Sequence, residues 1–407
     1  MNEGNSTIGF PTELVQEGKV KVLVPKLKAF AKLPSEYAPS KAPVFYNPVM
    51  ELNRDMAVLA LQTHQQMMNR EISVCEPLTS SGIRGIRFAA EVKGVKQVLI
   101  NDINEKAIQL ASHNVQMNGL NGKITMQNED ANRLLSCYNA PLKRFDAIDV
   151  DPFGSPAPYI DSALRALRDG GLLALTATDM APLCGVHPKA CIRKYGGKPL
   201  RTEYCHELAT RLLAGCLATM AAKQDIGIRI LFSHCTDHYI RVYAIIAYSA
   251  KKADESIRNM GYVLHCANCF HRETTKGLFG LQPSTKCSEC GSKIDFAGPL
   301  WLGKIIDGQF CELMERKAKH IPLKNSGKIW KTLTLTKCEA NAPITYYVLD
   351  AISDKLTLPV PSVNTLLQTL HQKGFQAVRT HFDSKGIKTD ASANVMKALL
   401  REVVAAN

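Results

Sequence analysis

Strand-like and helix-like patterns alternate between residues 72 and 248, and this alternation restricts the possible fold more than any other feature. Short apolar runs predict strands at residues 72–76, 95–101, 123–126, 145–150, 171–177, 226–235 and 239–248. Helical patterns at residues 82–91, 104–118, 158–168 and 203–222 lie between most of these strands. Strands that alternate with helices predict an α/β fold with a doubly wound, mostly parallel sheet.

An acidic residue follows each of four successive predicted strands: Glu76, Asp102, Asp130 and Asp151. In a parallel sheet these positions meet at one edge, where ligands of open α/β sheets bind. A single acid there is as often the N-cap of the next helix. Four in series favour a ligand site, and seven strands that end in an adjacent pair fit the class I (Rossmann-like) methyltransferase sheet.

The turn after the first of these strands, residues 76–85, contains only Gly82 and Gly85. A dinucleotide fingerprint needs three glycines so that the backbone can approach a pyrophosphate. A nucleoside cofactor without phosphate needs less, and S-adenosylmethionine is the candidate that fits.

The cofactor contacts expected on this basis are Arg54, Arg84, Asp102, Asp130 and Ala131. Asp102 lies 20 residues after Gly82, the distance at which an acid meets ribose hydroxyls. Asp130 and the Ala131 backbone are expected at the adenine edge. The two arginines are expected to bind the methionine carboxylate or to orient neighbouring acids, because guanidinium binds carboxylate bidentately.

The segment Asp151-Pro152-Phe153-Gly154-Ser155-Pro156 directly follows the strand at 145–150. The Asp151 carboxylate and a main-chain carbonyl of Asp151 or Pro152 would accept the two hydrogens of an exocyclic amine, and Phe153 would stack on a nucleobase. The alternative is a buried turn in which Asp151 caps the next helix. Asp149, on the same strand, is the rival catalytic acid and ranks second, because an acid inside a strand more often has a structural partner.

These motifs together resemble the tRNA guanine-26 N2-dimethyltransferase family, especially its archaeal members. The resemblance rests on the segments at residues 80–87, 101–102, 149–156 and 204–207 and covers nearly the whole chain. It implies S-adenosylmethionine as donor and the exocyclic N2 of a tRNA guanine as acceptor. It also implies the same five cofactor contacts and Asp151 as the catalytic acid.

The charge and cysteine content agree with a nucleic-acid enzyme of the cytoplasm. The chain has 407 residues and a formal net charge of +13, which points to a polyanionic partner such as tRNA. No stretch approaches the ~20 apolar residues of a membrane-spanning helix, and the first residues lack the pattern of a secretion signal. Thirteen scattered cysteines do not form a disulfide framework, and nothing indicates an obligate protein partner.

Two cysteine pairs, Cys266 with Cys269 and Cys287 with Cys290, are separated by the residues 270–286. This spacing predicts a structural zinc site of four thiolates, in a zinc-ribbon-like segment. His234 and His238 form a weaker pattern in a strand-turn-strand segment, and we expect them to be polar core or turn residues rather than metal ligands.

Three regions follow from these patterns. Residues 1–258 are expected to form the methyltransferase domain with a basic N-terminal extension, 259–300 the zinc segment, and 301–407 a small basic α/β domain, winged-helix-like, that docks tRNA. A basic loop around residues 189–201 is a further candidate for RNA contact. Alternatives to the guanine N2-methyltransferase are an adenine N6-type amino-methyltransferase on RNA or DNA, and a non-catalytic RNA-binding protein.

Overall fold

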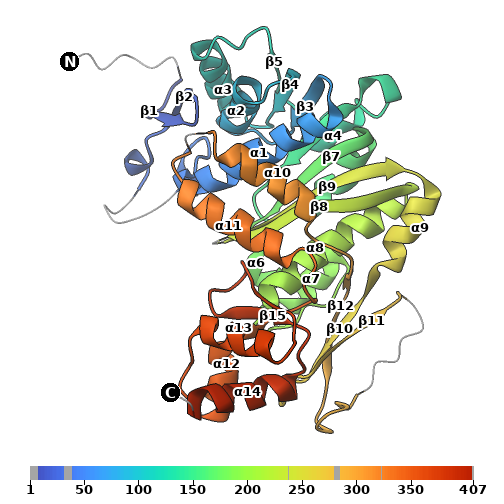
Figure 1. Ribbon diagram of the computed structural model, residues 1–407. Helices are drawn as coiled ribbons and strands as arrows, with labels where there is room; N and C mark the ends of the chain where they lie inside the picture. Colours follow the sequence, from blue (N-terminus) through green and yellow to red (C-terminus); the bar gives the residue numbers. More distant parts are fainter. Residues whose placement is uncertain (1–7, 32–38, 237, 279–284, 322, 406–407) are drawn as a thin grey trace. The chain divides into compact units, whose positions relative to one another are not determined.

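The fold contains a seven-stranded sheet, as the sequence predicts (Figure 1). The computed structural model describes residues 8–31, 39–236, 238–278, 285–321 and 323–405. The strands are β3 (Ile72–Glu76), β4 (Val95–Asn101), β5 (Ile124–Gln127), β6 (Phe145–Val150), β7 (Leu167–Ala177), β8 (Ile226–Thr236) and β9 (Tyr239–Tyr248). Their order is β5-β4-β3-β6-β7-β9-β8. The pairs among β3 to β7 are parallel, and β8 pairs antiparallel with β9, which confirms the predicted fold class.

Strand β7 begins earlier than its sequence suggests. The pair Gly170-Gly171 reads as a break before a strand, but the strand starts at Leu167, which pairs with Phe145. Gly170 has φ +74°, and the register between β6 and β7 shifts at this point. A glycine inside a strand commonly marks such an irregularity, so the two glycines bend β7 rather than precede it.

Contacts within the chain divide it into two compact units. The first contains residues 1–152, 159–175 and 313–330, and the second contains residues 153–158, 176–312 and 331–407. The expected boundaries at 258 and 300 stay a prediction. Short 3-10 helices lie at Leu27–Ala29, Pro39–Lys41, Pro48–Met50 and Pro141–Lys143.

In the first unit, helix α2 packs closely on the sheet. The helices here are α1 (Glu51–Met68), α2 (Ile83–Glu91), α3 (Glu105–Met117), α4 (Ala131–Ser136) and most of α5 (Ala157–Arg165). A Cβ on Gly85 of α2 would lie 2.4 Å from Ile100 Cγ2 of β4, and a Cβ on Gly82 would lie 2.9 Å from Ala111 Cβ of α3. Both glycines therefore serve helix packing.

The N-terminal extension begins with a hairpin of β1 (Thr12–Glu17) and β2 (Val20–Pro25). Alternate residues of β2, Val20, Val22 and Val24, are buried. Asn114 of α3 accepts a hydrogen bond from the Leu23 amide at 2.7 Å and donates to the Leu23 carbonyl at 2.9 Å. The hairpin is thus part of the packed first unit.

In the second unit, the long helix α8 (Cys205–Ala222) is almost entirely buried. It follows α6 (Met180–Leu183) and α7 (Pro188–Tyr195), and α9 (Ala250–Arg258) comes after the sheet. Strands β10 (Met260–His265), β11 (Arg272–Lys276) and β12 (Asp295–Trp301) form a separate antiparallel sheet in the order β11-β10-β12. The two cysteine pairs lie in the loops after β10 and before β12.

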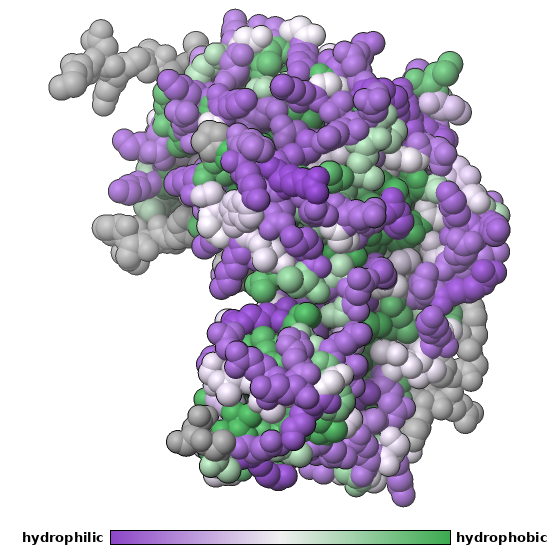
Figure 2. All heavy atoms as spheres, in the orientation of Figure 1, coloured by the Kyte–Doolittle hydropathy of each residue, from purple (hydrophilic) through white to green (hydrophobic). Residues whose placement is uncertain are grey.

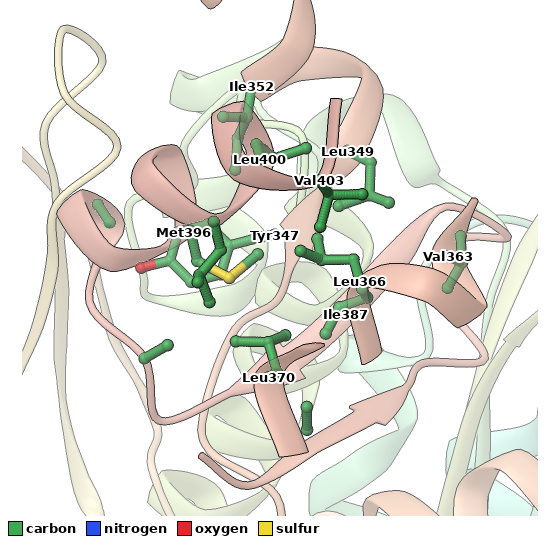
Figure 3. Close-up of a cluster of buried hydrophobic side chains, with 14 of the residues drawn as sticks. Tyr347, Leu349, Ile352, Val363, Leu366, Leu370, Ile387, Met396, Leu400 and Val403 are labelled. Atoms are coloured by element: carbon green, nitrogen blue, oxygen red, sulfur yellow. The ribbon is translucent and has the colours of Figure 1, made fainter. Parts of the chain in front are cut away.

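The C-terminal part begins with α10 (Gly308–Ala318) and α11 (Ser326–Glu339). It continues with β13 (Tyr347–Val348), α12 (Leu349–Leu356), α13 (Val363–Gln372), β14 (Ala377–Arg379), β15 (Gly386–Thr389) and α14 (Ala393–Ala405). Strand β15 pairs antiparallel with both β13 and β14, so the strand order is β13-β15-β14. The expected winged-helix likeness of this part stays a prediction. Figure 3 shows the core of this part, in which Leu366 and Leu370 of α13 lie with Ile387 of β15 and Met396 and Leu400 of α14.

The visible surface is mostly hydrophilic, with hydrophobic side chains in smaller patches (Figure 2). Among the described residues, no helix combines the length and the apolar character needed to cross a bilayer.

Candidate active site

The loops after β3, β4 and β5 are joined by one buried side chain, Asn101 at the end of β4. Its amide donates to the carbonyls of Pro77 and Glu129, both at 2.9 Å, and its oxygen accepts from the Glu129 amide at 3.1 Å. The three strand-end loops are therefore fixed relative to one another. The sequence indicates a ligand-binding role for the neighbouring Asp102 and none for Asn101, although an amide directly before a strand-end acid is a usable signal.

Asp102 also helps to fix the loops at this end of the strands. Its carboxylate accepts from the Ser80 amide at 2.8 Å and from the Asn104 amide at 2.9 Å. Ser80 has φ +54°, an uncommon value that this hydrogen bond helps to hold. A carboxylate offers about four acceptor positions, so Asp102 retains capacity for the two hydroxyls of a ribose.

Asp130 and Ala131 stand at the start of α4. The Asp130 carboxylate accepts from the amides of Asn132 at 2.9 Å and Arg133 at 3.0 Å, so the side chain is the helix N-cap. Ala131 is buried. Because the Asp130 side chain makes the cap, an adenine edge would be bound by the main chain of this turn. Contact with a cofactor stays a prediction for both residues.

Arg84 of α2 is the electrostatic centre of the site. Its guanidinium forms an ion pair with Asp151 and lies 3.4 Å from a Glu76 oxygen and 3.6 Å from an Asp149 oxygen. Arg84, Glu76 and Asp149 are buried, whereas the Asp151 side chain keeps 19% of its surface exposed. One cation thus faces three carboxylates, and Asp151 is the one that solvent or a ligand can reach.

Burial raises the pKa of Glu76 to about 8, although Arg84, the Thr79 hydroxyl and the Gly85 amide partly offset this effect. The carboxylate accepts from Thr79 Oγ1 at 2.5 Å and from the Gly85 amide at 2.9 Å. Three acids around one guanidinium carry an excess of negative charge, and this excess favours the retention of one proton near neutral pH.

Arg54 of α1 supports the segment that covers these loops. It donates to Glu17 at 2.7 Å and 2.5 Å and to the Asn47 carbonyl at 3.2 Å. The Ser80 hydroxyl donates to the Phe45 carbonyl at 2.5 Å, so residues 45–47 lie against the turn after β3. Arg54 is therefore engaged by an acid of β1, and its expected contact with the cofactor stays a prediction.

The turn that follows Asp151 and Pro152 exposes an aromatic ring. Pro152 is buried, whereas Phe153 is 71% exposed. Gly154 has φ +76°; its amide donates to Thr178 Oγ1 at 2.8 Å, and its carbonyl accepts from the Thr178 amide at 2.9 Å. These two bonds fix the backbone beside Phe153.

A second set of contacts extends from Thr178 to α7. The Tyr195 hydroxyl donates to the neighbouring Asp179 at 2.5 Å, and Lys194 Nζ lies 2.9 Å from the same carboxylate. Tyr195 also interacts with Ser155 of the Asp-Pro-Phe-Gly-Ser-Pro turn, and burial raises its pKa. The turn is thus connected to a basic helix.

The four cysteines of the two pairs come together. Cys266 Sγ lies 3.5 Å from Cys290 Sγ, Cys269 Sγ lies 3.6 Å from Cys287 Sγ, and all four sulfurs lie within 4.8 Å of one another. Tetrahedral zinc with Zn–S bonds of about 2.3 Å places its sulfurs roughly 3.8 Å apart. The arrangement therefore fits a closed, structural zinc site.

His234 and His238 do not join any metal-binding group among the described residues. His234 is buried and its Nδ1 lies 2.9 Å from Thr236 Oγ1. Burial lowers the pKa of His234 well below its ordinary value, so the ring is neutral. This agrees with the expected core and turn roles.

Comparison with known proteins gives matches along almost the whole chain. The family model described as N2,N2-dimethylguanosine tRNA methyltransferase matches residues 18–401. The chain is 41% identical to the tRNA (guanine(26)-N(2))-dimethyltransferase of Methanobrevibacter smithii, over 98% of this chain and 99% of that one. It is 39% identical to the enzyme of the same name from Methanosphaera stadtmanae, over 96% and 97%. The structure of Trm1 from Pyrococcus horikoshii with S-adenosyl-L-methionine is similar with a TM-score of 0.83 and 36% identity, over 95% of this chain and 99% of that one.

Proposed function

Because the chain belongs to the N2,N2-dimethylguanosine tRNA methyltransferase family, we propose that it transfers methyl groups from S-adenosylmethionine to N2 of guanine 26 in tRNA, with Asp151 holding the amine. The observation that carries the catalytic assignment is the pairing of Arg84 with three acids, of which Asp151 is the accessible one. The guanidinium orients Asp151 at the end of β6, beside the strands whose loops would hold the cofactor.

The cofactor pocket would be formed by the loops that Asn101 joins. Asp102 would accept hydrogen bonds from the ribose hydroxyls, and the main chain of residues 130–131 would face the adenine edge. Ile103, directly after Asp102, is 69% exposed. An apolar side chain left in solvent beside a ribose-binding acid suits the face of an adenine ring, and we add Ile103 to the expected contacts.

The chemistry needs an acceptor for the amine protons. The lone pair of guanine N2 is delocalised into the ring, so the amine is a poor nucleophile. When bound, S-adenosylmethionine supplies a methyl group on a positively charged sulfur. Asp151 accepts one N–H of the amine, a main-chain carbonyl of Asp151 or Pro152 accepts the other, and together they aim the lone pair at the methyl group. As the new C–N bond forms, the bond between the methyl carbon and sulfur breaks, its electron pair stays on the now neutral sulfur, and the amine loses a proton to Asp151.

The base has to leave the RNA stack to reach this acid. Phe153, exposed beside Asp151 in the sequence, is placed to stack on the extracted base, and Pro152 is the buried residue that holds the turn. After one methylation a single N–H remains, so the second transfer relies on one of the two acceptors only.

The tRNA would bind through phosphate contacts. Helix α7 and the loop after it carry Lys189, Arg193, Lys194, Lys198 and Arg201. All except Lys198 are exposed, and Lys198 pairs with Asp295 at 2.5 Å. Lysine and arginine side chains that contact phosphates contribute affinity for RNA but do not recognise its base sequence. The C-terminal unit, residues 347–405, is proposed as a second docking surface.

Zinc bound by Cys266, Cys269, Cys287 and Cys290 would stabilise the β10–β12 sheet and take no part in the chemistry. No disulfide joins the cysteines in the described part of the chain, which suits a reducing, cytoplasmic location.

Transfer of labelled methyl from S-adenosylmethionine to an unmodified tRNA transcript tests the function. Digestion to nucleosides should give N2-methylguanosine and N2,N2-dimethylguanosine, and a transcript with adenosine at position 26 should accept no label. Label in N6-methyladenosine, or equal labelling of both transcripts, would contradict the assignment.

A further inference from the structure

A second group of metal-binding side chains lies outside both the candidate active site and the four-cysteine site. Cys184, Cys205 and His206 each offer one ligand atom, and these atoms lie within 4.8 Å of one another. Cys184 ends helix α6, whereas Cys205 and His206 begin helix α8. Two soft thiols and an imidazole form a ligand set that zinc favours.

The backbone brings the two halves of this group together without any metal. Gly185 has φ +87°, and a Cβ there would lie 2.7 Å from the Arg201 amide nitrogen and 2.8 Å from the Leu200 carbonyl carbon. The chain just after Cys184 therefore touches the chain just before Cys205. Since this contact is backbone against backbone, it holds the two segments together whatever rotamers the side chains adopt.

The group is also accessible. All three residues are partly exposed, unlike the buried Cys191 and Cys216 of the same unit. A metal ion can thus reach the thiols from solvent. Three protein ligands leave the fourth position of a tetrahedral zinc for water, which is the stoichiometry of open zinc sites.

We propose that Cys184, Cys205 and His206 bind a zinc ion that joins the end of α6 to the start of α8 and so closes the basic segment 185–204. This segment contains α7, whose Tyr195 and Lys194 bind Asp179. A metal bonded to both ends of a segment removes the conformations in which those ends separate. The zinc ion would therefore order the positively charged surface that faces RNA in the proposed function.

Metal analysis of the full-length protein tests the site directly. The protein is incubated with Zn²⁺, passed through a desalting column and measured by mass spectrometry of the metal. We expect about two zinc ions per chain in the unchanged protein and about one in Cys184→Ser, Cys205→Ser and His206→Ala. Cys338→Ser, which removes an exposed thiol elsewhere, should keep about two and serves as the matched control.

A second measurement, made first on the unchanged protein, tests the proposal even if one variant folds poorly. Hydrogen exchange of peptides from residues 185–204 should be slower with Zn²⁺ than with chelator in the unchanged protein, and unaffected by Zn²⁺ in Cys184→Ser. The proposal is wrong if the unchanged protein holds only about one zinc ion, or if the three variants hold as much as the Cys338→Ser control. Neither readout depends on methyl transfer, so failure here leaves the proposed function untouched.

Discussion

Replacement of Asp151 by asparagine tests whether this residue acts in catalysis or only stabilises the structure. The amide keeps the size of the side chain and one acceptor oxygen but cannot take up the proton that the alkylated amine releases. Loss of a proton acceptor in the transition state lowers rates by about 10²–10⁴-fold, which corresponds to ~2.7–5.4 kcal/mol in the barrier. We expect a fall of that size in the single-turnover rate of methyl transfer.

The stability of this variant should change little, because Arg84 keeps two of its three acids. Removing one partner of a buried pair ordinarily costs about 3–5 kcal/mol, since an unpaired charge remains. Here Glu76 at 3.4 Å and Asp149 at 3.6 Å still face the guanidinium. We therefore expect the free energy of unfolding to fall by less than about 1 kcal/mol.

Asp149→Asn is the matched control, because it removes a carboxylate from the same guanidinium and the same strand. Single-turnover rates with labelled cofactor, calorimetric affinity for the cofactor and urea unfolding should be measured on both variants. The reasoning is refuted if Asp149→Asn slows transfer as much as Asp151→Asn does. It is equally refuted if Asp151→Asn loses cofactor affinity and stability in proportion to its rate.

Other predictions test the pocket, the turn and the zinc site. The pKa of Glu76 is raised to about 8, so its ionised form grows as pH rises from 6 to 9, and affinity for the cationic cofactor should increase over that range. Calorimetry should show proton release in the unchanged protein, and release that persisted in Glu76→Gln would contradict this origin. Tyr195→Phe removes the hydroxyl bound to Asp179 and should slow transfer by about tenfold or less while cofactor affinity stays unchanged, since one hydrogen bond contributes ~0.5–1.5 kcal/mol. Cys290→Ser should release the structural zinc and expose residues 260–301 to protease, whereas resistance equal to the unchanged protein would argue against a metal there.

Periodicity was enough to predict the sheet and the acids at its edge. The apolar residues of the run 145–150 alternate with Asp146 and Asp149, and this pattern predicted β6, which is buried at every position. The residue after the strand is then placed at the ligand edge of the parallel sheet. The cysteine pairs were equally readable, because zinc sites impose a spacing. Those parts of the site follow from local sequence alone.

The partners of individual side chains could not be predicted in the same way. Arg54 pairs with Glu17 of a hairpin that is 37 residues away, and nothing in either segment marks the other. Asn101 reaches the loops of two neighbouring strands only after the sheet has formed. Arg84 is an intermediate case, since its orientation of nearby acids was one of two expected roles and its three acids became clear only from the structure.

The excess of acids around Arg84 has a consequence for turnover. S-adenosylmethionine carries one net positive charge, and the product left after methyl transfer is neutral, so the surplus anionic charge attracts the fresh donor more than the spent one. A dimethylation requires two donors in succession. The acids around Arg84 would therefore favour exchange of the spent molecule for a fresh donor between the first and second methyl groups.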